Sequence, residues 1–336
     1  MKVTINDIAK LANVSKTTVS KVINNKAEGV GEETRKKILK IIEELNYQPS
    51  AIARGLVTKR THSIGLIIPD IANPFFPQLA RGVEDIAIKN GYNVFLCNSD
   101  NDVEKEEGYI KAFIDKSVDG MILTSSTSIS DSHYQALKEK KIPFILVDRY
   151  IEGIEGGAGV FSDNKEGAYK AVNYLLEHGH EKIAFISGPL SITTALHRLN
   201  GYQAAHYDKG IEIDYDLVQE GNYHFKSGFE FIEQLITAKK KFSAVFAAND
   251  MIAIGVVKAL KKHNIKIPDD VEVIGFDDID TATLVEPALS TVAQPIYDMG
   301  ALGAAMLIKM IEGKEIDQKN IYLKSELVLR ETTRRE

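Results

Sequence analysis

Polar side chains that suit the binding of a hydroxylated ligand stand directly after several apolar runs in this sequence. Asp148 and Arg149 follow one run, Asn249 and Asp250 follow another, and Asp277 ends a third. Carboxylates and amides accept hydrogen bonds from hydroxyl groups, and the guanidinium fork of an arginine donates to adjacent oxygens. The set therefore predicts a site for a polyol.

The apolar runs that carry these residues are short, and amphipathic helices separate them. The first series places strands at 63–69, 93–98, 120–124 and 143–148, with helices at 76–90, 103–116 and 131–140. The second series places strands at 159–162, 182–187, 218–220, 244–247 and 272–277, with helices at 165–177, 198–209, 226–236 and 251–263. Alternating strands and helices predict doubly wound parallel sheets, and two series predict two lobes of an α/β core.

The last part of the chain is expected to connect the two lobes. A short crossing strand is predicted at 289–291, a helix at 296–312 and a further strand at 322–329. Ligands of open parallel sheets bind beyond the carboxyl ends of the strands. The polar residues at those ends would therefore line one cleft, with Arg198 on the loop after strand 182–187 and Gln294 near a crossing.

The first sixty residues differ in charge from the remainder of the chain. They hold 12 lysines and arginines against 6 acidic residues, whereas residues 61–336 hold 29 against 41, and the net charge of the whole is −6. A basic head on an acidic body predicts that a polyanion binds at one end.

Two short helices separated by a tight turn are predicted within this basic head. Thr4 is a suitable N-cap for a helix over 5–12, and Ser15 is placed to cap a second helix over 16–24. A third helix with an apolar stripe follows residue 31. The pattern predicts a helix-turn-helix, and the alternative is a three-helix bundle with a polar surface.

The second helix carries four polar residues on one outward face near its N-terminal end. They are Lys16, Thr17, Ser20 and Lys21. A recognition helix presents this end to base edges in the major groove of DNA. Ser20 and Lys21 suit phosphate contacts equally well, and such contacts position a protein without reading sequence.

The stretches VTINDIAKLANVSKTTVSKVIN and LNYQPSAIARGL, at residues 3–24 and 45–56, resemble the headpiece and hinge of the LacI/GalR family of bacterial regulators. The likeness extends over essentially the whole chain. It implies a DNA-binding headpiece over residues 1–58, with a hinge helix at about 50–57, and an effector-binding core over 59–336. The implied DNA contacts are Thr4, Ser15, Lys16, Thr17, Ser20, Lys21, Asn24, Tyr47, Ser50, Ala53, Arg54 and Leu56. Leu56 would be the hinge residue that wedges into the minor groove with its dimer mate.

The core is similar to the ribose-type regulators of this family in its motifs NPFF, VDR, SDN, ND, FDD and AQP. The resemblance implies two lobes joined by three crossings, as in a periplasmic sugar-binding protein. The first lobe would take about 61–159 and 292–322, and the second about 160–290 and 323–336. The implied effector contacts are Asn73, Phe75, Phe76, Asp148, Arg149, Ser162, Arg198, Asn249, Asp250, Phe276, Asp277 and Gln294.

Several of these residues suit a structural role as well. Phe75 and Phe76 suit an apolar core, and Asp148 with Arg149 suits a surface salt bridge. Asp163 is as well placed to cap the helix that follows it as to touch a ligand.

Other classes of protein lack their signals in this sequence. The N-terminus has no apolar signal segment and no run is long enough to span a bilayer, so we expect no membrane association and a cytoplasmic location. The single cysteine excludes an internal disulfide framework. We find no phosphate-binding glycine loop, nucleophile elbow or metal-ligand spacing, and therefore expect neither an enzyme nor a cofactor.

The partners expected are double-stranded operator DNA, a small sugar and a second copy of the chain. A two-fold homodimer reads a palindromic operator. The predicted function is a repressor released from DNA by a ribose-like sugar. The alternatives are a response to a sugar acid such as 2-keto-3-deoxygluconate, a response to a corepressor, and a sugar-binding transport protein.

Overall fold

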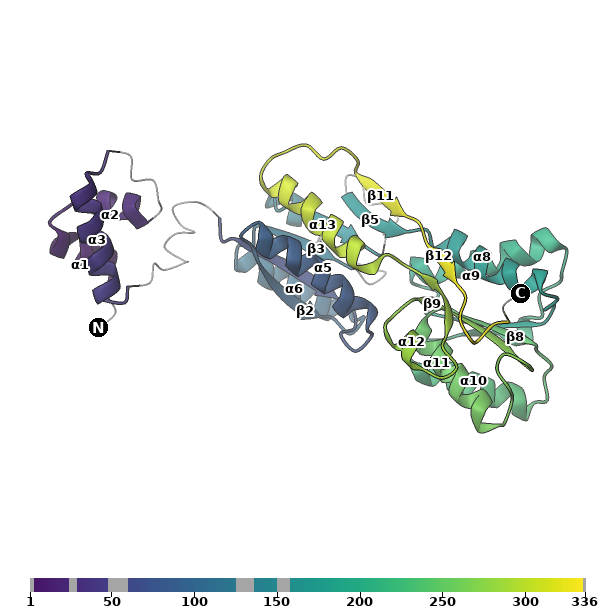
Figure 1. The fold of residues 1–336 in the computed structure, drawn as a ribbon. Helices are drawn as coiled ribbons and strands as arrows, with labels where there is room; N and C mark the ends of the chain where they lie inside the picture. The colour runs from purple at the N-terminus through teal and green to yellow at the C-terminus, as the bar shows by residue number, and fades with distance from the viewer. Residues whose placement is uncertain (1–2, 24–28, 48–59, 125–135, 150–157, 335–336) are drawn as a thin grey trace. The chain divides into compact units, whose positions relative to one another are not determined.

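The structure is a computed structural model that describes residues 3–23, 29–47, 60–124, 136–149 and 158–334. The chain divides into two compact units, residues 1–61 and residues 62–336 (Figure 1). None of the helices in the described ranges has the length and apolar character needed to cross a membrane.

The first unit contains three short helices around a small apolar core. They are α1 (Ile5–Ala12), α2 (Lys16–Ile23) and α3 (Glu32–Glu44). Their buried side chains are Ile8, Ala9, Ala12, Val19, Val22 and Ile38. Asn13 adopts a left-handed conformation at the turn between α1 and α2, with φ of 58°, which is tolerated by asparagine better than by most residues. The predicted helix-turn-helix is confirmed.

The caps expected from the sequence are also present in this unit. The Thr4 backbone N–H and hydroxyl both donate to Asp7 Oδ2, at 2.9 and 2.7 Å. Ser15 Oγ accepts a hydrogen bond from the backbone N–H of Thr18 at 3.0 Å. Each cap satisfies a backbone or side-chain group at a helix start, where no intrahelical partner exists.

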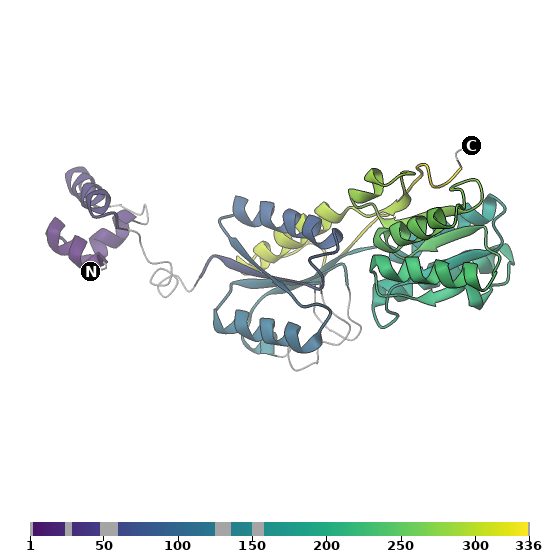
Figure 2. The same cartoon turned by 90° about the horizontal axis from the view of Figure 1, so that it is seen from below.

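The second unit is built on two six-stranded sheets. The first has the order β11-β5-β4-β3-β1-β2, with every described pair parallel. Its strands are β1 (Ser63–Ile68), β2 (Asn93–Asn98), β3 (Gly120–Leu123), β4 (Phe144–Val147), β5 (Ala158–Ser162) and β11 (Asn320–Leu323). Helices α5 (Phe75–Lys89) and α13 (Ile296–Ile311) cover one face, and α6 (Val103–Asp115) covers the other (Figure 2).

The second sheet has the order β12-β10-β9-β8-β6-β7, and only the β10–β12 pair is antiparallel. Its strands are β6 (Ile183–Ser187), β7 (Val218–Glu220), β8 (Ala244–Ala247), β9 (Glu272–Asp277), β10 (Ser290–Ala293) and β12 (Glu326–Val328). Its helices are α8 (Asn164–Glu177), α9 (Thr193–Lys209), η1 (Tyr215–Leu217), α10 (Phe225–Thr237), α11 (Asp250–Lys262) and α12 (Thr281–Leu284). The α8–α9 pair and the α10–α11 pair lie on opposite faces (Figure 1).

The chain passes between the two sheets three times. It leaves the first sheet after β5, returns to it after β10, and leaves it again between β11 and β12. Ser162, at the first crossing, shares a hydrogen bond of 2.8 Å with Ser325, at the third crossing. The α/β class, with a doubly wound two-lobed core and an all-α headpiece, is therefore confirmed.

Two details of the sequence interpretation are wrong. The strand predicted at 159–162 was assigned to the second lobe, but β5 pairs with β4 and β11 in the first sheet. The single strand predicted at 322–329 is two strands, and each belongs to a different sheet. Local apolar pattern identifies a strand but not its neighbours, because sheet pairing is a long-range property. Residues 131–135 of the helix predicted at 131–140 lie outside the described residues, and residues 136–139 are helical.

Helices α5 and α13 approach each other closely at two glycines. A Cβ atom on Gly82 would lie 2.2 Å from the carbonyl oxygen of Tyr297, and one on Gly300 would lie 2.1 Å from that of Leu79. Neither position has room for a larger side chain unless a helix moves. This contact fixes the N-terminus of α5, which carries part of the site described next.

Candidate functional site: a polar pocket between the lobes

A pocket lies where the carboxyl ends of the two sheets face each other, and the space among its lining atoms, solvent at its mouth included, is about 280 Å³. It is lined by residues of both lobes. They are Asn73, Phe75, Phe76, Asp148, Arg149, Thr194, Arg198, Tyr223, Asn249 and Asp277.

The first-lobe wall begins at the N-terminus of α5. Phe75 and Phe76 are buried, and their rings meet edge to face with centroids 5.0 Å apart. Asn73 Oδ1 accepts a hydrogen bond from the backbone N–H of Phe75 at 3.1 Å, which holds the turn into the helix. Both rings belong to the first-lobe core and also line the pocket, so the two roles considered for them coexist.

Asp148 and Arg149 complete this wall at the end of β4. Both are buried, with 6% and 4% of their surface exposed, so they are not a surface salt bridge. Asp148 has a left-handed φ of 68°, and its Oδ1 has no hydrogen-bond partner. Burial raises the pKa of the Asp148 carboxyl, although Arg149 and Arg198 oppose the shift. A strained, buried acceptor without a partner is typical of a binding site.

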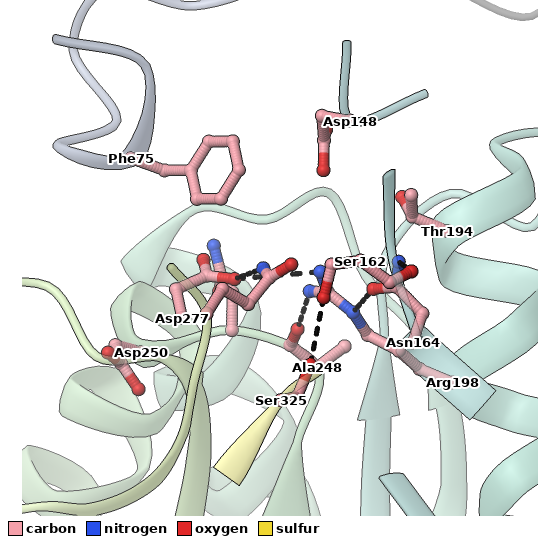
Figure 3. Close-up of polar contacts among 12 residues, drawn as sticks. Phe75, Asp148, Ser162, Asn164, Thr194, Arg198, Ala248, Asp250, Asp277 and Ser325 are labelled. Carbon is pink, nitrogen blue, oxygen red and sulfur yellow. Dashed lines mark hydrogen bonds and ion pairs between the residues drawn. The ribbon is translucent and has the colours of Figure 1, made fainter. Parts of the chain in front are cut away.

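Arg198 is the most constrained group on the second-lobe wall (Figure 3). Its Nε donates to Asn164 Oδ1 at 2.8 Å, and its guanidinium also donates to the Ala248 carbonyl. The guanidinium carbon lies 3.8 Å from the centroid of the Phe276 ring. Such a stack orients the planar guanidinium toward the pocket.

Arg198 was expected on a loop, but it lies in the second turn of α9. The helix begins at Thr193, five residues earlier than predicted, after an N-cap residue, Ile192, whose side chain makes no capping bond. Without a capping side chain, the sequence gives no signal for this helix start.

Asp277 ends β9 opposite Arg198. Its Oδ1 accepts from Gln294 Nε2 at 2.7 Å and lies 3.5 Å from a terminal nitrogen of Arg198. Burial raises the pKa of the Asp277 carboxyl to about 7, against the opposing effects of Arg198 and Gln294. Its φ of 116° lies in a region that residues other than glycine rarely adopt.

Eight of the twelve predicted effector residues line the pocket, and four do not. The four are Ser162, Asp250, Phe276 and Gln294. Phe276 stacks on Arg198 and Gln294 binds Asp277, so both lie directly behind the lining. Asp250 is fully buried, and its oxygens accept from Ile279 N–H at 2.9 Å and Thr291 Oγ1 at 2.5 Å. Asp163 Oδ1 caps α8 by accepting from the Glu166 N–H.

Two lining residues were missed by the sequence analysis, Thr194 and Tyr223. Tyr223 follows β7, so its position after a strand end was an available signal. It has a left-handed φ of 66°, and its ring lies where a Cβ atom on Gly188 would be, 2.1 Å from Cζ. Asn249 Nδ2 donates to the Tyr223 carbonyl at 3.0 Å and holds this loop against α11.

The predicted DNA-contact residues of the first unit lie mostly on its surface. Thr4, Ser15, Lys16, Thr17 and Lys21 are exposed, and Ser20 and Tyr47 are partly buried. Asn24, Ser50, Ala53, Arg54 and Leu56 lie outside the described residues.

A helix-turn-helix unit and a two-lobed core with a polar pocket define a DNA-binding regulator with a small-molecule site. Residues 4–50 match the bacterial regulatory proteins of the lacI family, and residues 61–327 match the periplasmic binding proteins and sugar binding domain of the LacI family. The chain belongs to the LacI family. It is a transcription regulator and not an enzyme.

Three known proteins illustrate the likeness. The ribose operon repressor of Halalkalibacterium halodurans is 41% identical over 331 residues, which cover 98% of this chain and 97% of that protein. The lac repressor dimer bound to operator and the anti-inducer ONPF has a TM-score of 0.88 and 26% identity, with 99% of each chain covered. A LacI family regulator from Enterococcus faecium with bound ribose has a TM-score of 0.73 and 31% identity, with 81% of this chain and 98% of that one covered.

Proposed function

We propose that this protein is a cytoplasmic repressor of a sugar-utilisation operon and that a neutral monosaccharide of the ribose class releases it from its operator. The observation that carries this proposal is the buried set of Asp148, Arg149, Arg198 and Asp277 around one small pocket. The ribose operon repressor of H. halodurans and the ribose-bound regulator of E. faecium support the choice of sugar.

The chemistry of the pocket favours a neutral sugar over a sugar acid. Asp148 Oδ1 is a buried acceptor without a partner, and a sugar hydroxyl is a donor that satisfies it. Asp277 adds a second carboxylate to the same lining, and two carboxylates repel the carboxylate of a sugar acid. Arg198 already donates to Asn164 and Ala248 and faces Asp277, so fewer of its donors remain for an anion.

A sugar acid is the second candidate, because two arginines line the pocket. Arg149 and Arg198 are both buried there, and an arginine fork recognises a carboxylate well. A purine corepressor is a weaker candidate, because the carboxylates and arginines of the lining suit the hydroxyl groups of a sugar.

We also propose that the protein acts as a homodimer. The edge strand β2 exposes Phe95 and Leu96, with 50% and 39% of their surface accessible, and Ile88 on the adjoining α5 is 61% exposed. An exposed apolar edge strand readily pairs with another chain, and a two-fold axis places the same patch on both subunits. The lac repressor dimer bound to operator supports this arrangement.

In this proposal, the exposed N-terminal end of α2 reads the operator, and the hinge segment at about 50–57, which lies outside the described residues, contacts it as well. Sugar binding favours a lobe arrangement in which the hinges are apart, so operator affinity falls. A typical coupling free energy of about 1–3 kcal/mol corresponds to a decrease of roughly 5- to 150-fold.

The experiment has two parts. Thermal shift and calorimetry with pentoses, hexoses, sugar acids and purines identify the effector, and D-ribose is expected to bind. A palindromic site is then selected from random DNA with the full chain, and its affinity is measured with and without saturating sugar. Unchanged operator affinity with every ligand would contradict induction. Leu56→Ala is expected to weaken operator binding and leave sugar affinity intact.

A further inference from the structure

The segment after β12 contacts the loop that carries a pocket residue. Arg330 donates through a terminal nitrogen to the Leu289 carbonyl at 2.9 Å, and its backbone N–H donates to Ser290 Oγ at 2.7 Å. Its other terminal nitrogen forms an ion pair with Asp278 Oδ1 at 2.7 Å. One arginine thus ties the C-terminal segment, the start of β10 and the turn after β9 together.

The turn that Arg330 contacts is strained. Asp277 and Asp278 are consecutive non-glycine residues with left-handed φ values of 116° and 62°. Such conformations cost free energy and persist only where surrounding contacts impose them. The next residue, Ile279, is held by its N–H bond to Asp250 Oδ2 at 2.9 Å and is buried against the first-lobe core. The turn is therefore held on its far side by Ile279 and on its near side by Arg330.

We propose that Arg330 is a positioning residue for effector binding, which acts through Asp278 to hold the 277–278 turn so that the Asp277 carboxylate faces Arg198 and the pocket. The effector part of this inference rests on the proposed function. The ion pair is shielded, with side chains only 17% and 24% exposed, so solvent screens it less than a surface pair.

The same C-terminal segment offers a matched control. Arg334 also joins this segment to the lobe, since it donates to the Asp269 carbonyl at 2.6 Å and lies 3.7 Å from Glu272 Oε1. Glu272 begins β9, at the opposite end of the strand from Asp277. Truncation of Arg334, whose side chain is 58% exposed against 17% for Arg330, therefore removes a second arginine tether of this segment without touching the 277–278 turn.

The first experiment follows the titration of the Asp277 carboxyl by NMR in the full chain without ligand. In Arg330→Met, the midpoint is expected to fall by one pH unit or more from about 7, because the released turn exposes the carboxyl to water. Asp278→Asn is expected to shift it similarly. In Arg334→Met the midpoint is expected to stay as in the wild type. An unchanged midpoint in Arg330→Met overturns the proposal.

The second experiment measures D-ribose affinity by calorimetry well below every melting temperature. Arg330→Met and Asp278→Asn are each expected to weaken binding by about tenfold, because each removes one side of the shielded ion pair that holds the turn. The double variant should bind no more weakly than either single one, and Arg334→Met should bind like the wild type. Equal losses in Arg330→Met and Arg334→Met, or losses that multiply in the double variant, contradict positioning through Asp278. A wild-type protein that binds no monosaccharide refutes the proposed function instead, while the titration still decides the role of Arg330.

Discussion

Replacement of Asp277 by asparagine should change how the stability of the ligand-free protein depends on pH. The carboxyl is buried and its pKa is raised from the ordinary 3.8 to about 7. Between these two values the folded state holds a proton that the unfolded state has released. Stability therefore falls as pH rises through this window and has no further dependence on this group above it.

The size of the effect follows from the difference of about 3 pH units between the two pKa values. One unit corresponds to about 1.4 kcal/mol, so ionisation of Asp277 destabilises the ligand-free core by about 4 kcal/mol at neutral pH relative to about pH 4. Arg198 and Gln294 favour the charged form of Asp277 and Asp148 disfavours it, while the charge of Asp277 in turn raises the pKa of the buried Asp250. Asp277→Asn removes the ionisable group, so the free energy of unfolding of the variant should lose the part of its pH dependence that Asp277 causes.

Urea unfolding at several pH values between 4 and 8 measures the slope of the free energy of unfolding against pH. The wild type should lose stability over this range by more than Asp277→Asn does, and the difference between the two should reach a few kcal/mol. Asp298→Asn, which changes an exposed carboxylate at the start of α13, serves as the control and should keep the wild-type slope. Equal slopes for the wild type and Asp277→Asn would refute the argument that burial without a ligand holds the proton on this group.

Three further predictions concern other parts of the molecule. Arg198→Met should weaken sugar binding by tenfold or more in calorimetry, because loss of a charged donor typically costs about 1.5–3 kcal/mol; unchanged affinity would remove Arg198 from the site. Phe95→Glu should convert the dimer to a monomer in sedimentation. Tyr207→Glu, which changes a side chain 86% exposed on the second lobe, should leave the dimer intact. A Phe95→Glu variant that remains dimeric would show that the interface lies elsewhere. Gly82→Ala should lower the free energy of unfolding by about 1–3 kcal/mol through overpacking against α13. Gly108→Ala on α6, where a Cβ meets nothing within 4 Å, should be neutral or stabilising. Similar melting temperatures for the two variants would contradict the close contact between α5 and α13.

Much of the fold follows from sequence periodicity, because each element satisfies a local rule. The inner strands of both sheets are short and largely buried runs. Helix starts with a capping residue, such as Asp163 before α8, also follow from the sequence. Failures occurred where the deciding contact is distant. The membership of β5 depends on β4 and β11, and the division between β11 and β12 depends on which sheet each segment meets.

The pocket shows the same limit at the level of single residues. Position after a strand end identified Asp148 and Asp277, and the same rule applies to Tyr223, which lies three residues after β7. Thr194 lacked a signal altogether, since it lies on a helix whose start carries no capping side chain.

Asp250 and Asp277 show why strand ends supply candidates but do not assign roles. Each carboxylate follows or ends a buried strand of the same sheet, β8 or β9, and each is buried with a raised pKa because of desolvation. The oxygens of Asp250 are taken by Ile279 N–H and Thr291 Oγ1, which belong to segments beside β9 and in β10. Asp277 instead meets Arg198 and Gln294 at the pocket. A carboxylate whose acceptors are satisfied by the fold stabilises the fold, and we expect one that lines the pocket beside an oriented cation to serve a ligand. We therefore infer that the different roles of Asp250 and Asp277 are set by the donors on neighbouring segments, and not by the aspartates themselves.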